Sequence, residues 1–501
     1  MKTPAAATPA ILLLALALSA CSGKTSSPPQ AGTPPPSPPA LTPTATPAAR
    51  PAPPVSAGPS RWGLKRFRAP FAFFEVRVIP GPDPETDAWT FEAGGEPFAC
   101  APQRRETAWE FSSCSGGGGN RLRAVIRDDD KLDIELTKDG EVLRERLLRV
   151  EERDEPASLN VELLWRRPNS FERSINTGIW AADGVVFAPN SAGVVELLEA
   201  STGARLGIAN ANLAAGRGPT AVQEVTARGG YLYVATTTRG VVVFDVRNPA
   251  SPRLAAQVMV DAGDNSREAF TNVHTLTLSR DGLTLYAVNQ SHPSTDLRII
   301  DVSNPEAPRE IGRYLRPVPD VLDGFHDITV IDRGGQRIGF LASLRSGLLI
   351  VDLTDAKSVR LLGSITWENT LSHSGAAFEV GGKLYYAHND EGFDQGMTVL
   401  DVTDLGSPRV VGRYQTRRGA SIHNLEVVGN FAYVSYYLDG LRVVDLRDPA
   451  RPREVAHFDT VPAADERRTF QGAWGVKVHE GRVFISDMQS GVFAFRVTLP
   501  D

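Results

Sequence analysis

VVVFDVRNPASPRL, residues 241–254, returns four more times along the chain and decides the fold. The later copies are LRIIDVSNPEAPREIGRY from Leu297, LLIVDLTDAKSVRLLGS from Leu348, MTVLDVTDLGSPRVVGRY from Met397 and LRVVDLRDPARPREVAHF from Leu441. Recurrence of one pattern at a near-constant period is the signature of a protein built from structural repeats.

Each repeat contains four strand-like pieces, most clearly HNLEVVGN, FAYVSYY, GLRVVDL and REVAHF in the sixth. Four short strands per unit predict the blades of a β-propeller. The shared aspartate ends a strand before a turn, so we expect it to cap backbone N–H groups. It is found at Asp245, Asp301, Asp352, Asp401 and Asp445, and two weaker copies place Leu198 and Arg496 there, which makes seven repeats.

The repeat core, [LIV]-x-[VI]-[IVL]-D followed by N/D-P-x-x-P and G-x-Y, resembles the LVIVD-repeat family of bacterial cell-surface β-propeller proteins. The resemblance covers about residues 170 to 498, and it implies the fold while indicating little about activity. We therefore expect an all-β chain with a seven-bladed propeller in residues 160–498. The last repeat supplies only three strands, so residues 161–166 are predicted to cover its open edge.

Residues 61–155 alternate apolar and polar side chains with period two, as in Leu122–Arg127 and Leu132–Leu136. This pattern predicts a small β-sandwich-like domain. The acidic triplet at residues 128–130 fits either a solvated turn, which we expect, or a cation site.

Cys100 and Cys114 are the only thiols besides Cys21, and in an exported protein we expect them to form a disulfide.

Residues 1–20 have the features of a signal peptide, with Lys2 ahead of an apolar run that is too short to span a bilayer. Leu18-Ser19-Ala20-Cys21 resembles the lipobox of bacterial lipoproteins, which implies that Cys21 is acylated, for example with palmitate, and anchors the mature chain. An ordinary signal peptide with a chance cysteine is the alternative. Ser22 in place of Asp favours the outer membrane or cell surface, by resemblance to enterobacterial sorting.

The segment 21–60 is a linker, because it contains 13 prolines and almost no side chain apolar enough to bury. The chain carries a formal net charge of -6 and has no concentration of Lys and Arg, so a nucleic-acid partner is excluded. We expect a monomer that contacts the membrane through its lipid and binds an unidentified protein or glycan.

Four histidines, His274, His326, His373 and His423, stand at the start of the first, innermost strand of consecutive repeats. They therefore point to one mouth of the axial channel, where Asn176, Gln223 and Trp474 occupy the matching positions. Consensus histidines would bond to backbone between neighbouring blades, which is the outcome we expect. Ligands of Zn, Cu or Fe would instead converge, with ring nitrogens about 4 to 5 Å apart.

Long loops at the same mouth, NQSHPSTD and HNDEGFDQG, make it the expected working face. His388, Asp390, Glu391 and Asp394 form the densest ligand-like cluster there, which fits either a Ca²⁺ site or, as we expect, a solvated polar loop. Two function classes remain: a displayed interaction platform, and a metal-dependent enzyme or metal-binding protein at the axial histidines. The signal peptide, the lipobox and the linker favour the displayed platform. No catalytic residue is predicted, because no catalytic motif occurs.

Overall fold

The computed structural model describes residues 65–68, 75–79, 88–93, 96–105, 108–116, 120–127, 131–138, 141–150 and 155–500, apart from 263–265, 267, 291–294, 316–323, 393–394 and 463–470. The predicted signal peptide, Cys21, the linker and the acidic triplet 128–130 lie outside these residues. Within them, no helix is long and apolar enough to cross a membrane.

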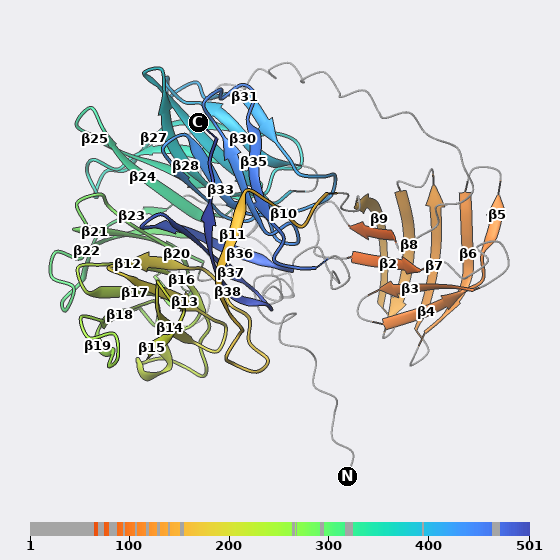
Figure 1. The fold of residues 1–501 in the computed structure, drawn as a ribbon, viewed down its shortest axis with the longest axis horizontal. Helices are drawn as coiled ribbons and strands as arrows, with labels where there is room; N and C mark the ends of the chain where they lie inside the picture. Colours follow the sequence, from red (N-terminus) through yellow and green to blue (C-terminus); the bar gives the residue numbers. More distant parts are fainter. Residues whose placement is uncertain are drawn as a thin grey trace, which may run out of the picture.

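The N-terminal domain is one nine-stranded antiparallel sheet that curls until its two halves face each other (Figure 1). Its strands are β1 (Lys65–Arg68), β2 (Glu75–Ile79), β3 (Trp89–Ala93), β4 (Glu96–Cys100), β5 (Gln103–Arg105), β6 (Ala108–Ser115), β7 (Arg121–Arg127), β8 (Lys131–Lys138) and β9 (Glu141–Val150). β4 pairs with β6 as well as with β3, so the layers of the predicted sandwich-like domain are parts of one continuous sheet.

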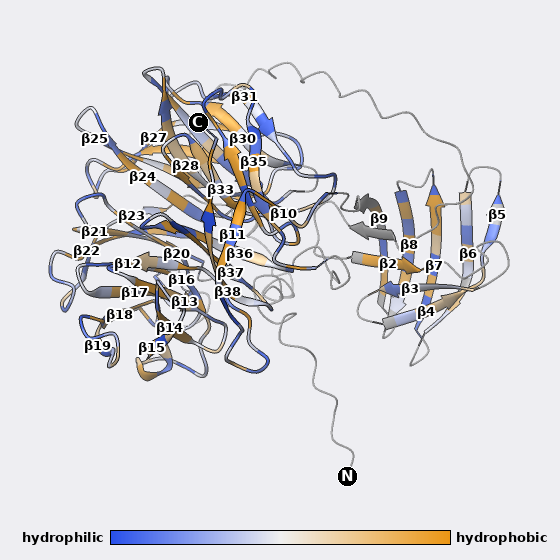
Figure 2. Cartoon of the chain, in the orientation of Figure 1, coloured by the Kyte–Doolittle hydropathy of each residue, from blue (hydrophilic) through white to orange (hydrophobic). Residues whose placement is uncertain are grey.

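Alternation along the strands produces the core of this domain. In β7, Leu122, Ala124 and Ile126 are buried while the arginines between and beside them are exposed, and Figure 2 shows the alternation of hydropathy. Cys100 and Cys114 face each other across the β4–β6 pairing and form the predicted disulfide.

The rest of the chain forms seven antiparallel sheets arranged as the blades of a propeller (Figure 1), which confirms the predicted fold. Blade one is β12 (Trp180–Ala182), β13 (Val185–Pro189), β14 (Val194–Glu199) and β15 (Arg205–Asn210), and a short 3-10 helix, η3 (Ala211–Leu213), follows it. Blade two is β16 (Val222–Arg228), β17 (Tyr231–Thr236), β18 (Val241–Asp245) and β19 (Arg253–Val258), and blade three is β20 (Val273–Leu278), β21 (Thr284–Asn289), β22 (Asp296–Asp301) and β23 (Arg309–Leu315).

Blade four is β24 (Asp327–Arg333), β25 (Gln336–Ala342), β26 (Leu348–Asp352) and β27 (Arg360–Ile365), and blade five is β28 (Ser372–Val380), β29 (Lys383–Asp390), β30 (Gly396–Asp401) and β31 (Arg409–Tyr414). Blade six is β32 (Leu425–Val428), β33 (Phe431–Ser435), β34 (Leu441–Asp445) and β35 (Arg453–Phe458), with β10 (Ser158–Leu159) added at its edge. Blade seven is β36 (Ala473–His479), β37 (Arg482–Asp487), β38 (Gly491–Val497) and β11 (Val161–Arg167). The first strands of successive blades contact one another around the ring, so they are the innermost.

The repeated aspartate caps the turn after each third strand, as predicted. In all five copies one carboxylate oxygen accepts the backbone N–H of the residue two positions later, at 2.9 to 3.1 Å. The alignment of blade one was wrong by one residue, because Glu199 rather than Leu198 occupies the aspartate position. A register shift lies just before Leu198 in blade one and just before Phe244 in blade two, so Glu199 is the structural equivalent of Asp245.

The glycine of the G-x-Y motif allows close contact between neighbouring blades. A Cβ at Gly312 in blade three would lie 1.8 Å from the carbonyl oxygen of Ala356, in the turn of blade four. Gly412 in blade five approaches Pro449 of blade six in the same way, at 2.2 Å. Any side chain at these positions would push the blades apart.

The ring closes through β11, the predicted strand, which pairs antiparallel with β38 from Val161–Val497 to Arg167–Val492. In Figure 1 the yellow β11 lies beside the dark blue β38, although the two are far apart in sequence. Trp165 secures this pairing, since its ring lies 5.9 Å from that of Phe484 and its Nε1 donates to the Ala200 carbonyl at 3.2 Å.

Trp165→Ala should lower the free energy of unfolding of the propeller by about 2 to 4 kcal/mol, because it removes a large side chain that joins blades seven and one. Leu163→Ala is the matched control, since Leu163 lies on the same strand but is 42% exposed, and it should cost less than about 1 kcal/mol. Denaturant unfolding monitored by far-UV circular dichroism measures both. Equal losses in the two variants would contradict this role of Trp165.

Candidate functional site

The four predicted histidines lie side by side at one mouth of the channel. Ring centroids are 4.2 Å apart for His274 and His326, 4.1 Å for His326 and His373, and 4.3 Å for His373 and His423. Trp474 of blade seven continues the arc, with its ring centroid 4.2 Å from that of His423. Each histidine is brought there by the first strand of its own blade.

The arc lines a small cavity of about 10 Å³, which has room for about one water molecule and is far below the roughly 300 to 1,000 Å³ that is typical for drug-sized ligands. Its lining residues are Gln223, Glu224, His274, Thr275, His326, Asp327, His373, His423, Asn424 and Trp474. Asn176 was wrongly placed with them, because its side chain donates to the Asp487 carbonyl instead. In blade one, a Cβ at Gly178 would lie 2.1 Å from Glu224 Oε1, so the glycine leaves room for that carboxyl group.

His423 makes the contact expected of a structural histidine, because its Nδ1 lies 2.6 Å from the Trp474 carbonyl oxygen in the next blade. A neutral imidazole must donate from Nδ1 in this contact, which leaves the lone pair on Nε2. His373 behaves differently. Its Nδ1 lies 3.3 Å from Glu391 Oε2 and has no hydrogen-bond partner.

Glu391 therefore belongs to the histidine arc. One ligand atom from each of His373, Glu391 and His423 can be chosen so that all three lie within 4.8 Å of one another. Tyr437 orients the carboxylate by donating to Glu391 Oε1 at 2.7 Å. Burial opposes ionisation of Glu391, but the positive charge of His373 outweighs it and lowers the pKa of Glu391 to about 2.

The interpretation of HNDEGFDQG as a solvated polar loop was wrong. His388 and Asp390 lie in β29 and are fully buried, and Glu391 is 7% exposed. Asp390 accepts hydrogen bonds from Thr370 Oγ1, the Leu371 N–H and the Gly392 N–H, at 2.6 to 2.8 Å, so its carboxylate holds the loop together. Asp394, the last member of the suggested calcium cluster, lies outside the described residues.

The carboxyl groups of Glu224 and Asp327 also line the cavity. Each follows directly after a predicted axial residue, Gln223 or His326. Burial raises the pKa of Glu224 to about 8 and that of Asp327 to about 7. Burial also lowers the pKa of His274 to about 4. Burial acts in the same direction on His373, but the Glu391 carboxylate outweighs it and raises the pKa of His373. The mouth thus combines an imidazole that burial keeps neutral, an imidazole paired with a carboxylate, and carboxyl groups that titrate near neutral pH.

Unpartnered polar atoms gather in blades four and five, and two of them belong to histidines that line the cavity. His326 Nδ1, His373 Nδ1, both ring nitrogens of His388, Ser372 Oγ and Asn389 Oδ1 are buried without a hydrogen-bond partner. Each such atom costs free energy unless an ion, a water molecule or a ligand satisfies it. Their concentration in blades four and five makes the channel mouth the candidate site.

A second acidic and histidine cluster, Glu155, Glu454 and His457, lies where the N-terminal domain joins blade six. Both nitrogens of His457 are engaged, with Glu454 Oε1 at 2.6 Å and the Pro156 carbonyl oxygen at 2.8 Å. Arg442 binds Glu155 Oε1 at 2.6 Å. This cluster fixes the chain as it enters the propeller.

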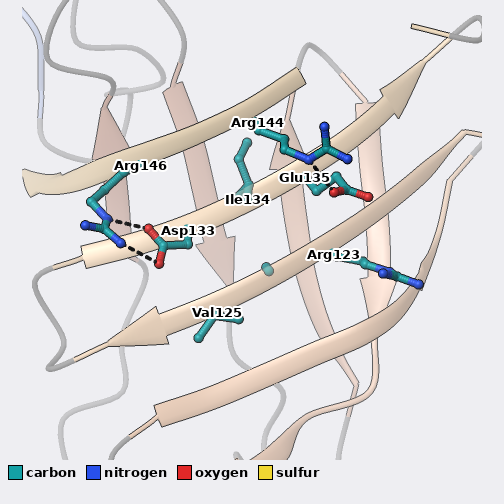
Figure 3. A pocket seen from close by; sticks show the side chains of 8 residues that line it. Arg123, Val125, Asp133, Ile134, Glu135, Arg144 and Arg146 are labelled. Atoms are coloured by element: carbon teal, nitrogen blue, oxygen red, sulfur yellow. Dashed lines mark hydrogen bonds and ion pairs between the residues drawn. The ribbon is translucent and has the colours of Figure 1, made fainter. Parts of the chain in front are cut away.

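A groove on the outer face of the N-terminal sheet is lined by charged residues of β7, β8 and β9 (Figure 3). Arg146 binds both carboxylate oxygens of Asp133, at 2.6 and 3.1 Å, and Arg144 binds Glu135 at 2.7 Å. These arginines are more than half exposed, so the pairs stabilise little and the groove presents ordinary solvated charge.

A scan against protein-family models matches the LVIVD repeat at residues 220–260, 293–316, 392–416 and 420–460. The chain contains LVIVD repeats. These matches fall in blades two, three, five and six, where the sequence copies are clearest. Of the residues at the mouth, Gln223 lies in the first match and His423 in the fourth, while His373 and Glu391 lie outside the matched ranges.

A search of curated proteins finds no match. Among solved structures, the chain is similar to U3-55K (TM-score 0.48, 9% identity, 68% of this chain and 98% of that one) and to the RRP9 WD40 repeats (TM-score 0.49, 10% identity, 68% and 99%). It is also similar to the computationally designed Ika8 protein (TM-score 0.41, 10% identity, 75% and 93%). The assignment as a propeller rests on the strand pairing of this chain itself.

The raised pKa of Glu224 predicts a pH dependence of stability. The folded state binds this proton more tightly than the unfolded chain, so the stabilisation is complete below the ordinary pKa of 4.5 and is lost as pH rises through about 8. One such group changes the free energy of unfolding by at most about 1.4 kcal/mol per pH unit. Glu224→Gln should remove this loss, so the variant should gain stability relative to the parent between pH 5 and pH 9.

Denaturant unfolding across that pH range measures the difference, with the exposed Glu172→Gln as the control. If the difference in free energy of unfolding between the parent and Glu224→Gln does not change with pH, the raised pKa of Glu224 is contradicted.

Proposed function

We propose that this protein is an exported, lipid-anchored binding protein whose propeller acts as an interaction platform for a protein or glycan. The LVIVD-repeat propeller fold itself suggests such a platform. Beyond the fold, we propose that lipid on Cys21 anchors the protein at the outer membrane or cell surface. We also propose that one face of the propeller, the face at the channel mouth, binds the partner.

The observation that carries the choice of face is the unequal length of the connections. On the face away from the mouth, only Gly381 and Gly382 join β28 to β29. At the mouth, residues 459–472 join β35 to β36, and residues 259–272 join β19 to β20. Binding residues concentrate on long loops that a rigid scaffold positions, so the mouth face is the binding face.

The mouth face also carries the most exposed large apolar side chain in the described part of the chain. Leu213 follows blade one in η3 and is 70% exposed. An exposed leucine among polar loops suits a contact with a partner surface. The linker supports display, because a polyproline-like chain of this length at ~3.1 Å per residue reaches roughly 120 Å.

Cys21→Ser should move the protein from the membrane fraction to the soluble fraction of the exporting cells, because the residue that would carry the acyl chains is gone. Fractionation and immunoblotting measure the distribution, and mass spectrometry of the parent N-terminus should show acyl groups on Cys21. Retention of the Ser variant in the membrane would contradict the anchor.

Leu213→Asp should weaken binding of immobilised protein to cell-surface extracts by at least about tenfold, because it places a charge on the proposed face. Leu283→Asp is the matched control, since Leu283 is 52% exposed in the β20–β21 turn on the opposite face. Quantitative mass spectrometry and glycan analysis of the retained material compare the two. Equal retention by both variants and the parent would place the binding surface elsewhere.

A further inference from the structure

We propose that His373, Glu391 and His423 form a binding site for one divalent transition metal ion, of the class of Zn²⁺, at the mouth of the propeller channel. This inference does not depend on the interaction platform or on the lipid anchor. It rests on donor geometry, on the surroundings of each donor and on the contrast with the other cluster of similar composition.

The spacing of the three donors suits a metal. Two ligands of a tetrahedral ion, each at about 2.0 to 2.1 Å from it, lie roughly 3.3 Å apart. His373 Nδ1 and Glu391 Oε2 are separated by 3.3 Å, and a donor atom of His423 completes a set within 4.8 Å. Separations in the set of up to 4.8 Å must shorten to roughly 3.3 Å when the ion binds.

The donor set is that of an open metal site. Two imidazoles and one carboxylate hold a divalent ion through three protein ligands and leave a further position for water or an exogenous ligand. Both histidines line the cavity, whose volume of about 10 Å³ has room for about one water molecule as the additional ligand.

Hydrogen bonds behind the donors resemble the supports of metal ligands. The Trp474 carbonyl fixes the His423 proton on Nδ1 and leaves Nε2 with its lone pair. Tyr437 holds Glu391 through Oε1, which leaves Oε2 directed at His373. Ser374 Oγ and Asn389 Nδ2 both donate to the His423 carbonyl, at 2.9 and 3.1 Å, and fix its backbone.

The simplest competing explanation is a buried ion pair between protonated His373 and Glu391. The two groups lie at ion-pair distance, but the geometry disfavours this explanation as a complete one, because the Nδ1 atom of the buried His373 makes no well-formed hydrogen bond to the carboxylate 3.3 Å away. A buried ion pair is favourable only when its hydrogen bonds are well formed. A metal between the two groups would satisfy both without a hydrogen bond.

The cluster of Glu155, Glu454 and His457 provides an internal control. Its composition is also suitable for a metal, but both nitrogens of His457 are already bonded within the protein and Arg442 supplies the positive charge. At the channel mouth, the described residues that line the cavity include no arginine or lysine. A cation is therefore expected at the mouth and not at the entry to the propeller.

The test measures Zn²⁺ binding to the folded, metal-stripped full chain by equilibrium dialysis with elemental analysis. The parent should bind one tightly held Zn²⁺ per chain. Glu391→Gln should lower the affinity by at least roughly 100-fold, and Tyr437→Phe by roughly 10- to 100-fold, because the first removes a ligand and the second removes its orienting hydrogen bond. His457→Gln should leave the affinity unchanged.

Circular dichroism and melting curves establish that each variant is folded. Tyr437→Phe changes only one hydroxyl, so it keeps the test decisive if Glu391→Gln unfolds. The Co²⁺-loaded parent should also show the intense visible absorption of a four-coordinate ion. Absence of stoichiometric Zn²⁺, binding that Glu391→Gln and Tyr437→Phe leave unchanged, or loss of binding only in His457→Gln would each overturn the site.

Discussion

The pairing of β11 with β38 is the constraint on which the rest of the propeller depends. Blade seven receives only three strands from the C-terminal end of the chain, and β11 supplies the fourth. The fit is specific, because a Cβ at Gly491 would lie 2.0 Å from the Arg167 carbonyl oxygen, just as one at Gly440 would lie 2.2 Å from the Phe458 carbonyl oxygen in blade six. β11 therefore takes the place of an ordinary fourth strand.

Closure gives the channel mouth its chemistry. Only a complete ring holds the first strands of seven blades against one another, and that arrangement brings four imidazoles from four blades within 4.1 to 4.3 Å of their neighbours. Desolvating so many polar groups is costly. The hydrophobic packing within and between the blades offsets this cost, so the repeat scaffold supports a polar centre that could not fold alone.

Much of the fold follows from the sequence because a recurring pattern identifies positions that are structurally equivalent in every blade. Blade number, the capping role of Asp245 and its equivalents, and the closing strand could all be predicted from pattern and turn chemistry. The error at Leu198 arose because a register shift in blade one is invisible in a degenerate copy. Asn176 failed for a similar reason, since the Asn176–Asn190 pair is equivalent to Val222–Thr236 in blade two, where the following residue, Gln223, lines the cavity.

The candidate site was only partly predictable. The histidine arc follows from equal positions in equal repeats, but the burial of Glu391 depends on contacts with other segments, as with Tyr437 and Leu371, that no local pattern encodes. Glu224 and Asp327 carried a usable signal, because an acidic residue directly follows a predicted axial residue in both cases. An acid at the start of an innermost strand is buried by the ring, and its pKa rises accordingly.

The central claim is that ring closure gathers His373, Glu391 and His423 into one metal site. An anomalous difference map from crystals of the full chain grown with Zn²⁺, recorded on both sides of the zinc absorption edge, tests it most directly. The account predicts one strong peak about 2.0 to 2.2 Å from an imidazole nitrogen of each histidine and from an oxygen of Glu391. A map with no peak there, or with its only strong peak beside His457, would contradict it.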